Sequence, residues 1–112
     1  RGRGIIPNSI TIAVLTSGET YSAANYFAGV VRNFPNFVLI GTKTGGGGSW
    51  TTTSVLPNGW TFTYPVAQAY DAQYRSLERG VEPDIKVEAT PLWYAKHYDI
   101  VLQTAYKYLL DR

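Results

Sequence analysis

The hydroxyl of Ser22 is the group in this sequence that is best placed for chemistry, because it lies where a short polar loop meets a predicted helix. Serine is favoured at the N-cap of a helix, where its hydroxyl accepts a hydrogen bond from a free backbone N–H group. A serine nucleophile at the same position would gain from the helix dipole and the free N–H groups, which stabilise developing negative charge. On the local pattern alone, capping is the commoner role, and nucleophilic attack is the alternative.

A serine nucleophile requires a base and a group that orients this base. The single histidine, His97, lies far downstream, just before the last predicted helix, and we expect its side chain at the surface or partly packed. Among the acids, Glu78 stands shortly before a predicted tight turn over residues 80–84. The pattern alone does not separate Glu78 from the other candidate acids, which are Glu19, Asp71, Glu82, Asp84 and Asp99.

Residues 41–49 form a glycine-rich segment that fails the test for a phosphate-binding loop. That motif requires a lysine directly after its second glycine, because the lysine reaches the phosphates. Here Gly46 is followed by Gly47, and the segment leads into a predicted strand rather than a helix. We therefore reject nucleotide binding and expect either a simple turn or exposed backbone that receives a peptide.

The composition excludes several other functions. The 112 residues suit one small domain, and 45% of them are apolar, which is enough for a core. A net charge of +2 without a basic stripe argues against a nucleic-acid partner. Because the chain has no cysteine and one histidine, we predict no disulfide, no metal and no cofactor. No apolar run is long enough to span a membrane. The chain also contains no methionine, which predicts a piece of a longer protein.

Hydrophobic periodicity predicts the elements that would position these residues. Residues 10–15 and 37–40 are short apolar runs, typical of strands buried on both faces of a parallel sheet. Residues 22–34 have helical spacing, so the three segments together predict a βαβ unit with a right-handed crossover. The helix is expected to turn its apolar side chains toward the sheet, namely Ala23, Phe27, Val30, Val31 and Phe34.

Further along the chain, the pattern predicts a hairpin, a short strand and a final helix. Residues 50–55 and 60–64 are predicted strands joined through Asn58-Gly59, a strong hairpin signal. Residues 85–87 predict a short strand, and Asp99 is expected to cap the final helix. Most aromatic side chains around the hairpin are expected in the core, with part of the set lining a cleft: Trp50, Trp60, Phe62, Tyr64, Tyr70 and Tyr74. Three more are expected to anchor the final helix: Trp93, Tyr94 and Tyr98.

Six segments, taken in order, resemble the C-terminal processing (tail-specific) peptidase family, which includes tricorn-core-like members and has a ClpP/crotonase-like fold. They are Ile-Ala-Val-Leu-Thr at 12–16, Ser-Ala-Ala-Asn at 22–25, Val-Leu-Ile-Gly-Thr-Lys-Thr-Gly-Gly at 38–46, Leu-Pro-Asn-Gly at 56–59, Glu-Arg-Gly-Val-Glu-Pro-Asp-Ile-Lys-Val at 78–87, and the helix that opens at Asp99. The resemblance implies an α/β fold: part of a ClpP/crotonase-like domain, with a βαβ unit followed by a β-hairpin region and a C-terminal helix. It also implies that residues 1–112 are the C-terminal portion of a peptidase catalytic domain.

Residue by residue, the resemblance implies that Ser22 is the nucleophile and that Ala23 supplies an N–H group to the oxyanion hole. Asn25 departs from the glutamate that is usual in the family's Ser-Ala-x-Glu pattern. The lysine of the family's Ser/Lys dyad would fall on Gly47, so that dyad is absent, and Lys43 lies four residues too early. Glu78 matches the glutamate of the tricorn-like branch, whose histidine comes from sequence upstream of this chain.

The resemblance therefore implies a serine peptidase whose partners are a peptide or protein substrate and the remainder of its own catalytic domain. Gly45, Gly46, Gly47 and Trp50 would border the peptide cleft, where the substrate adds as a strand. Because no histidine or lysine of this chain stands at a position that matches a base of the family, we expect the isolated piece to be inactive. The family implies an extracytoplasmic location, periplasmic or at the cell surface. A truncated domain would expose apolar surface, which favours a homo-oligomer.

Two other functions stay open on the sequence. A non-catalytic domain of the same fold that binds a ligand or peptide would lack the upstream histidine. An aromatic-lined carbohydrate or peptide module would expose Trp50 and Trp60 on one flat face.

Overall fold

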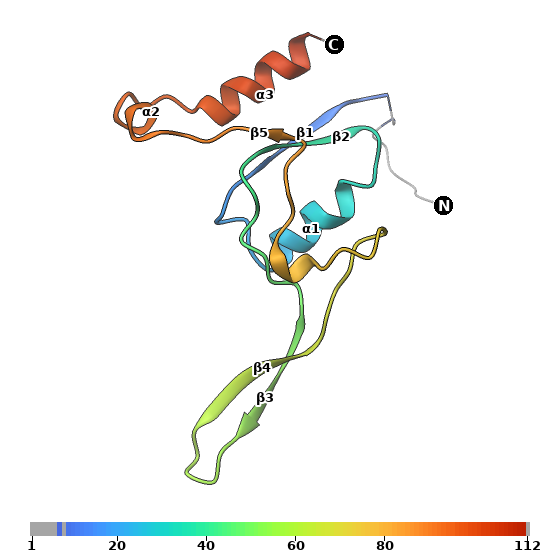
Figure 1. The fold of residues 1–112 in the computed structure, drawn as a ribbon, viewed down its shortest axis with the longest axis vertical. Helices are drawn as coiled ribbons and strands as arrows, with labels where there is room; N and C mark the ends of the chain where they lie inside the picture. The colour runs from blue at the N-terminus through green and yellow to red at the C-terminus, as the bar shows by residue number, and fades with distance from the viewer. Residues whose placement is uncertain (1–6, 8, 112) are drawn as a thin grey trace.

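The computed structural model describes residue 7 and residues 9–111, which form a mixed α/β fold (Figure 1). A parallel sheet forms the body, helices lie on its two faces, and a hairpin projects from one end. In chain order the elements are β1 (Ile12–Thr16), α1 (Ala23–Val31), β2 (Phe37–Gly41), β3 (Trp50–Val55), β4 (Thr61–Ala67), the short 3₁₀ helix η1 (Leu77–Arg79), β5 (Ile85–Lys86), α2 (Pro91–Ala95) and α3 (Ile100–Leu110).

The parallel sheet has the strand order β1-β2-β5, so β2 is its central strand. β1 pairs with β2 in register from Ile12 opposite Phe37 to Thr16 opposite Gly41. The predicted βαβ unit is therefore confirmed. The expectation that its first strand is buried on both faces is wrong, because β1 forms an edge of this sheet in the described residues and Leu15 is 42% exposed.

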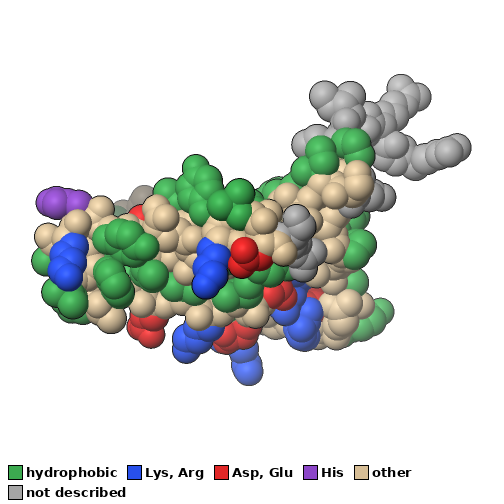
Figure 2. Space-filling model, turned by 90° about the horizontal axis from the view of Figure 1, so that it is seen from above, with side chains coloured by type: hydrophobic (Ala, Val, Ile, Leu, Met, Phe, Trp, Pro, Cys, Tyr) green, Lys and Arg blue, Asp and Glu red, His purple; other side chains and the backbone are tan. Residues whose placement is uncertain are grey.

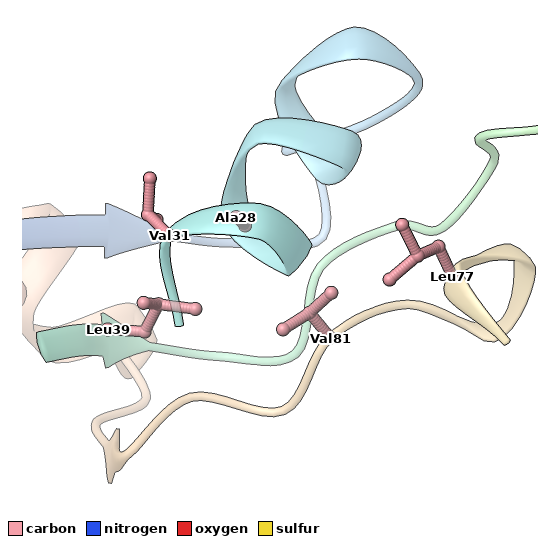
Figure 3. Packing of buried hydrophobic residues seen from close by; sticks show 5 residues of the cluster. All are labelled: Ala28, Val31, Leu39, Leu77 and Val81. Atoms are coloured by element: carbon pink, nitrogen blue, oxygen red, sulfur yellow. The ribbon is translucent and has the colours of Figure 1, made fainter. Parts of the chain in front are cut away.

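The central strand β2 separates two small cores, because successive side chains of a strand point to opposite faces. Leu39 packs toward α1 and η1, in a cluster with Ala28, Val31, Leu77 and Val81 (Figure 3). On the other face, Val38 and Ile40 pack with Ala105 of α3. The sheet thus holds α1 and η1 together on one side and α3 on the other.

The packing of α1 differs from the sequence-based expectation. The helix ends at Val31, and its buried face is built mainly from Asn25, Ala28 and Gly29, while Phe27, Val30 and Phe34 are about half exposed. The reason is close approach to η1: a Cβ atom on Gly29 would lie only 2.5 Å from Leu77 Cδ2. Small residues therefore face η1. Of the larger apolar side chains that were predicted to be buried, Val31 is buried, whereas Phe27, Val30 and Phe34 point outward.

The hairpin of β3 and β4 projects from the body of the molecule (Figure 1). Its turn contains Gly59 with a φ of 87°, a conformation that glycine adopts without strain. The expectation that its aromatic side chains lie mainly in the core is wrong, because in the described residues no second layer covers this two-stranded sheet. The exposed set comprises Trp50, Trp60, Phe62, Tyr64, Tyr70 and Tyr74.

The final helix begins as predicted, since the Asp99 carboxylate accepts a hydrogen bond from the backbone N–H of Leu102 at 2.9 Å. The ring centroids of Trp93, in α2, and Tyr98, directly before Asp99, lie 5.0 Å apart. Of the apolar residues of α3, Ala105 is buried, whereas Leu102, Tyr106 and Leu110 are exposed. Figure 2, which views the molecule from the side of α2 and α3, likewise shows hydrophobic side chains at the surface. No helix in the described part of the chain is long and apolar enough to cross a membrane.

Candidate active site

Ser22 stands at the N-terminus of α1 in a strained backbone conformation, with φ 56° and ψ −116°. Residues with side chains rarely adopt this region, and such outliers cluster at functional sites. The predicted capping role is wrong: among the described residues, the Ser22 side chain makes no capping hydrogen bond. The Ser22 backbone N–H instead donates to Gly46 O at 3.0 Å, which ties the turn to the glycine-rich loop. The hydroxyl is therefore available for another partner.

The strand–turn–helix geometry around Ser22 has a general parallel in hydrolases, where a strained turn between a strand and a helix presents a serine hydroxyl. Ser22 follows β1 by a loop and directly precedes α1. Ala23 is the first residue of α1, so its N–H is one of those that lack an acceptor within the helix. An N–H at this position carries the positive end of the helix dipole, which suits an anionic oxygen.

A pocket of about 340 Å³ opens beside Ser22. Its lining residues are Ser22, Ala23, Tyr26, Gly48, Ser49 and Trp50. None of these lining residues carries a charge, and the Tyr26 and Trp50 side chains give the pocket two aromatic walls. The pocket therefore suits an uncharged group lying against the serine hydroxyl.

Glu78 reaches this pocket through Ser49, a residue that the sequence analysis did not single out. The Ser49 hydroxyl donates a hydrogen bond to Glu78 Oε2. Glu78 itself is fixed in η1, where its backbone N–H donates to Ser76 Oγ at 3.3 Å. Ser49 and Ser22 line the same pocket, so Glu78 contacts a residue of the pocket wall although it does not line the pocket itself. No sequence signal marks Ser49, because its partner lies 29 residues away.

The glycine-rich loop allows segments of backbone to approach each other closely. Gly46 and Gly47 have φ values of 83° and 70°, and a Cβ atom on Gly46 would collide with Glu78 O. A Cβ atom on Gly47 would lie 2.9 Å from the Tyr21 ring. Gly46 and Gly47 are buried, Gly45 is exposed, and the pocket is lined instead by Gly48 and Trp50. A lysine at position 47 would meet both a strained backbone and the Tyr21 ring.

Asn25 joins the Ser22 helix to the segments that carry the loop and Glu78. Its side chain is 0% exposed, and its amide nitrogen donates to Gly47 O at 2.5 Å and to Leu77 O at 2.8 Å. Its amide oxygen accepts from the Thr44 hydroxyl at 2.5 Å. The residue that departs from the family pattern is thus a buried junction of three segments.

Three other candidate acids have structural partners elsewhere. Asp84 accepts a hydrogen bond from the backbone N–H of Leu39 at 2.8 Å, and Asp99 caps α3. Asp71 pairs with Arg75 at 2.6 Å. Burial raises the pKa of Asp71, but hydrogen bonds from the backbone and side chain of Arg75 outweigh this effect and hold the pKa below its usual range.

The two candidate bases that the sequence analysis considered, Lys43 and His97, do not line the pocket. Lys43 forms an ion pair with Glu82 at 3.1 Å, and both side chains are about half exposed. His97 follows α2, which Figure 1 places with α3, on the other side of the sheet from α1. Its placement agrees with the expected surface position. Within the described residues, Ser22 therefore has Glu78 near its pocket, while a base is not brought to it.

The parallel α/β fold thus combines a strained Ser22 with a nearby Ser49–Glu78 hydrogen bond, and the comparisons with known proteins support a domain of the serine peptidase type. The sequence pattern of peptidase family S41 matches residues 6–87, and the chain belongs to this family. A candidate peptidase from Parabacteroides merdae is similar in structure, with 34% identity and a TM-score of 0.83 over 89% of this chain and 32% of that one. No match was found among curated proteins.

Two solved proteases are also similar. The tricorn protease has 26% identity and a TM-score of 0.79, over 90% of this chain and 10% of that one. The photosystem II D1 C-terminal processing protease has 25% identity and a TM-score of 0.61, over 71% of this chain and 21% of that one. This chain therefore spans 32% or less of each of the three solved chains. The resemblance to C-terminal processing peptidases, predicted from the six segments, is confirmed.

Proposed function

We propose that these residues carry the nucleophile and the orienting acid of a serine peptidase active site, as the C-terminal portion of its catalytic domain. One observation carries the proposal: the strained Ser22 leaves its hydroxyl uncapped in a pocket whose wall, Ser49, binds Glu78. Backbone strain persists only where the surrounding structure enforces it, and a simple helix cap needs none. The resemblance assigns the same two residues, so geometry and sequence support one assignment.

In the proposed reaction, the Ser22 oxygen attacks the carbonyl carbon of a peptide bond while a base removes the hydroxyl proton. The Ala23 N–H stabilises the oxyanion that forms. The leaving amine takes the proton as the bond to the carbonyl carbon breaks, and water then hydrolyses the acyl-enzyme. Glu78 orients the base and stabilises its charged form, as the acid of a serine–histidine–acid triad does.

The base is proposed to be a histidine from outside these residues. Within the described residues, His97 follows α2, which lies across the sheet from α1, and Lys43 is paired with Glu82, so neither supports this role. Gly47 stands where the resembling family places its lysine, and its surroundings disfavour a long side chain there. A peptide is proposed to lie along the pocket and the start of β3, bordered by Gly48, Ser49 and Trp50.

Labelling by a fluorophosphonate probe tests the proposal, because this reagent requires an activated serine. The protein at full length should be labelled at Ser22, and both Ser22→Ala and Glu78→Gln should lose labelling, whereas Glu82→Gln, the matched acid in the Lys43 pair, should keep it. Residues 1–112 alone should stay unlabelled. Efficient labelling of residues 1–112 that is lost in Ser22→Ala would show that the base is not external.

A binding domain of the same fold is the second candidate function, favoured by the solvent exposure of two tryptophans. Trp50 and Trp60 are each 73% exposed, as an aromatic binding face requires. If the protein at full length binds a peptide or sugar with quenching of tryptophan fluorescence, yet shows no labelling at Ser22, the binding function replaces the peptidase. Quenching lost in Trp60→Ala, with labelling retained, would assign an additional role to the hairpin.

We further propose an extracytoplasmic location, on the ground of the family resemblance alone. Cell fractionation with an antibody against residues 9–111 tests this location. A protein recovered only with cytoplasmic markers would contradict it.

A further inference from the structure

We propose that Asn25 positions the Ser22 helix against the segment that carries Glu78, and that it does so only as a neutral amide. The inference rests on the proposed function in one respect, since Ser22 and Glu78 are the groups whose separation it controls. Asn25 itself does not line the pocket, so it is a positioning residue and not a catalytic one.

The first argument is the complete use of the Asn25 side chain. An asparagine amide offers two N–H donors and one oxygen acceptor. The donors reach Gly47 O and Leu77 O, and the oxygen accepts from Thr44, all in a site with no solvent exposure. Leu77 directly precedes Glu78, and Gly47 directly precedes the pocket residue Gly48. One side chain, three residues after Ser22, thus holds the backbone directly before Glu78 and directly before Gly48.

The second argument is the continuation of the network through Thr44. The Thr44 hydroxyl donates to Asn25 and accepts from the backbone N–H of Val81 at 2.6 Å. The Thr44 backbone N–H also donates to Val81 O at 3.0 Å. The segment after η1 is therefore held from both sides, and Glu78 lies between two anchored residues, Leu77 and Val81. A shift of α1 would move both anchors.

The third argument concerns charge. Gly47 O and Leu77 O are both acceptors, so a carboxylate at position 25 would place negative charge against two carbonyl oxygens without solvent. A buried charge without a partner is strongly disfavoured, and burial raises the pKa of a carboxyl group. A protonated carboxyl could serve one of the two carbonyls. The site therefore requires an amide, and an acid there would make the geometry depend on pH.

Asn25→Asp in the protein at full length tests this inference, read by hydrogen exchange of the backbone amides in residues 44–48 and 77–81. Because the introduced carboxyl has a raised pKa when folded, the variant is stabilised at low pH and loses stability as the pH rises through that pKa. We expect exchange roughly tenfold faster than in the wild-type protein at about pH 8, and a smaller ratio at about pH 5. Exchange in β1 and β2 should change less.

Two further variants control the experiment. Asn33→Asp is the matched change, because the exposed Asn33 amide donates to Gly29 O and Val30 O near the end of the same helix. It should leave exchange in residues 44–48 and 77–81 unchanged at both pH values. If Asn25→Asp does not fold, Thr44→Val, which removes only the hydroxyl link between Asn25 and Val81, should accelerate exchange in the same two segments.

Activity measurements separate this inference from the proposed function. If the wild-type protein hydrolyses peptides, Asn25→Asp should lower kcat with little change in KM, and the ratio of variant to wild-type kcat should rise as the pH falls. If the wild-type protein neither hydrolyses peptides nor accepts the fluorophosphonate probe, the proposed function fails, while the exchange data still decide the role of Asn25. Exchange ratios near one at both pH values, or ratios independent of pH, would overturn the inference.

Discussion

Replacement of Ser22 by glycine or alanine separates the chemical role of this residue from the strain of its backbone. Alanine would keep the φ of 56° and ψ of −116° at Ser22 at the same cost in strain, but glycine adopts these angles freely. Strain of this kind costs about 1–3 kcal/mol. Glycine also increases the conformational entropy of the unfolded chain, and this offsets about 1 kcal/mol of the strain that is relieved. The Ser22 hydroxyl makes no capping bond in the described structure, so its removal adds little.

We therefore expect Ser22→Gly to raise the free energy of unfolding by about 1 kcal/mol relative to Ser22→Ala, while both variants lose reaction with the probe. Urea unfolding of the protein at full length measures the difference, provided that the transition is two-state. His97→Gly is the matched control, because His97 has a φ of 51° and follows α2, outside the candidate site. It should gain stability and keep the reaction with the probe. If Ser22→Gly is no more stable than Ser22→Ala, the strain argument at Ser22 is refuted.

Three further predictions follow from packing, hydrogen bonding and charge. Gly29→Ala should lower the free energy of unfolding in urea by about 1–3 kcal/mol, because the new Cβ atom would clash with the buried Leu77 side chain, and this cost outweighs the usual gain in helix propensity. The control Gly18→Ala has open space around it and should not share this clash, whereas unchanged stability in Gly29→Ala would contradict the packing. Ser49→Ala should lower kcat by roughly tenfold, because the hydrogen bond to Glu78 is lost, and Ser49→Thr, which keeps a hydroxyl, should retain part of the activity. Equal kcat values for the wild-type protein and both variants would argue against a role of this hydrogen bond. Since the pKa of Asp71 is lowered in the folded protein, this group stabilises the fold above its unfolded pKa of about 3.9, and the stabilisation is lost as the pH falls through the folded pKa. Asp71→Asn should therefore weaken the fall of the melting temperature at acid pH, and an unchanged fall would show that Asp71 does not contribute to it.

Local signals in the sequence predicted the order of the elements well. The βαβ unit, the hairpin through Asn58-Gly59 and the cap at Asp99 each depend on residues close together in the chain. The buried face of α1 was not predictable in this way, because it is decided by Leu77, which lies 46 to 49 residues beyond Val31 and Ala28 in the chain. Apolar periodicity favoured Phe27 and Phe34, whereas close packing against η1 selects Ala28 and Gly29.

The exposed aromatic side chains show a second limit of pattern-based prediction. Alternating aromatic residues predict a buried strand face only if another layer lies against it. In the described residues, β3 and β4 pair only with each other, so Trp60, Phe62 and Tyr64 stay exposed. The composition of the hairpin does not show whether a second layer covers it. If the chain is part of a larger catalytic domain, as proposed, the rest of that domain could supply the covering layer. Shielding of Trp60 from acrylamide quenching in the protein at full length would support this arrangement.

The candidate site shows the same division between what local sequence encodes and what the fold creates. Ser22 and Glu78 were assigned by resemblance, but their spatial relation arises from Ser49, whose hydroxyl contacts Glu78, and from Asn25, whose amide holds the backbone on both sides. Gly47 contributes through its φ of 70°, a conformation that strains a residue with a side chain, and a Cβ atom there would also contact the Tyr21 ring. The same loop that disfavours a lysine base thus permits the close contact between Gly46 and Glu78. The geometry of this loop thus supports the proposed mechanism, in which Glu78 assists a base that comes from outside these residues.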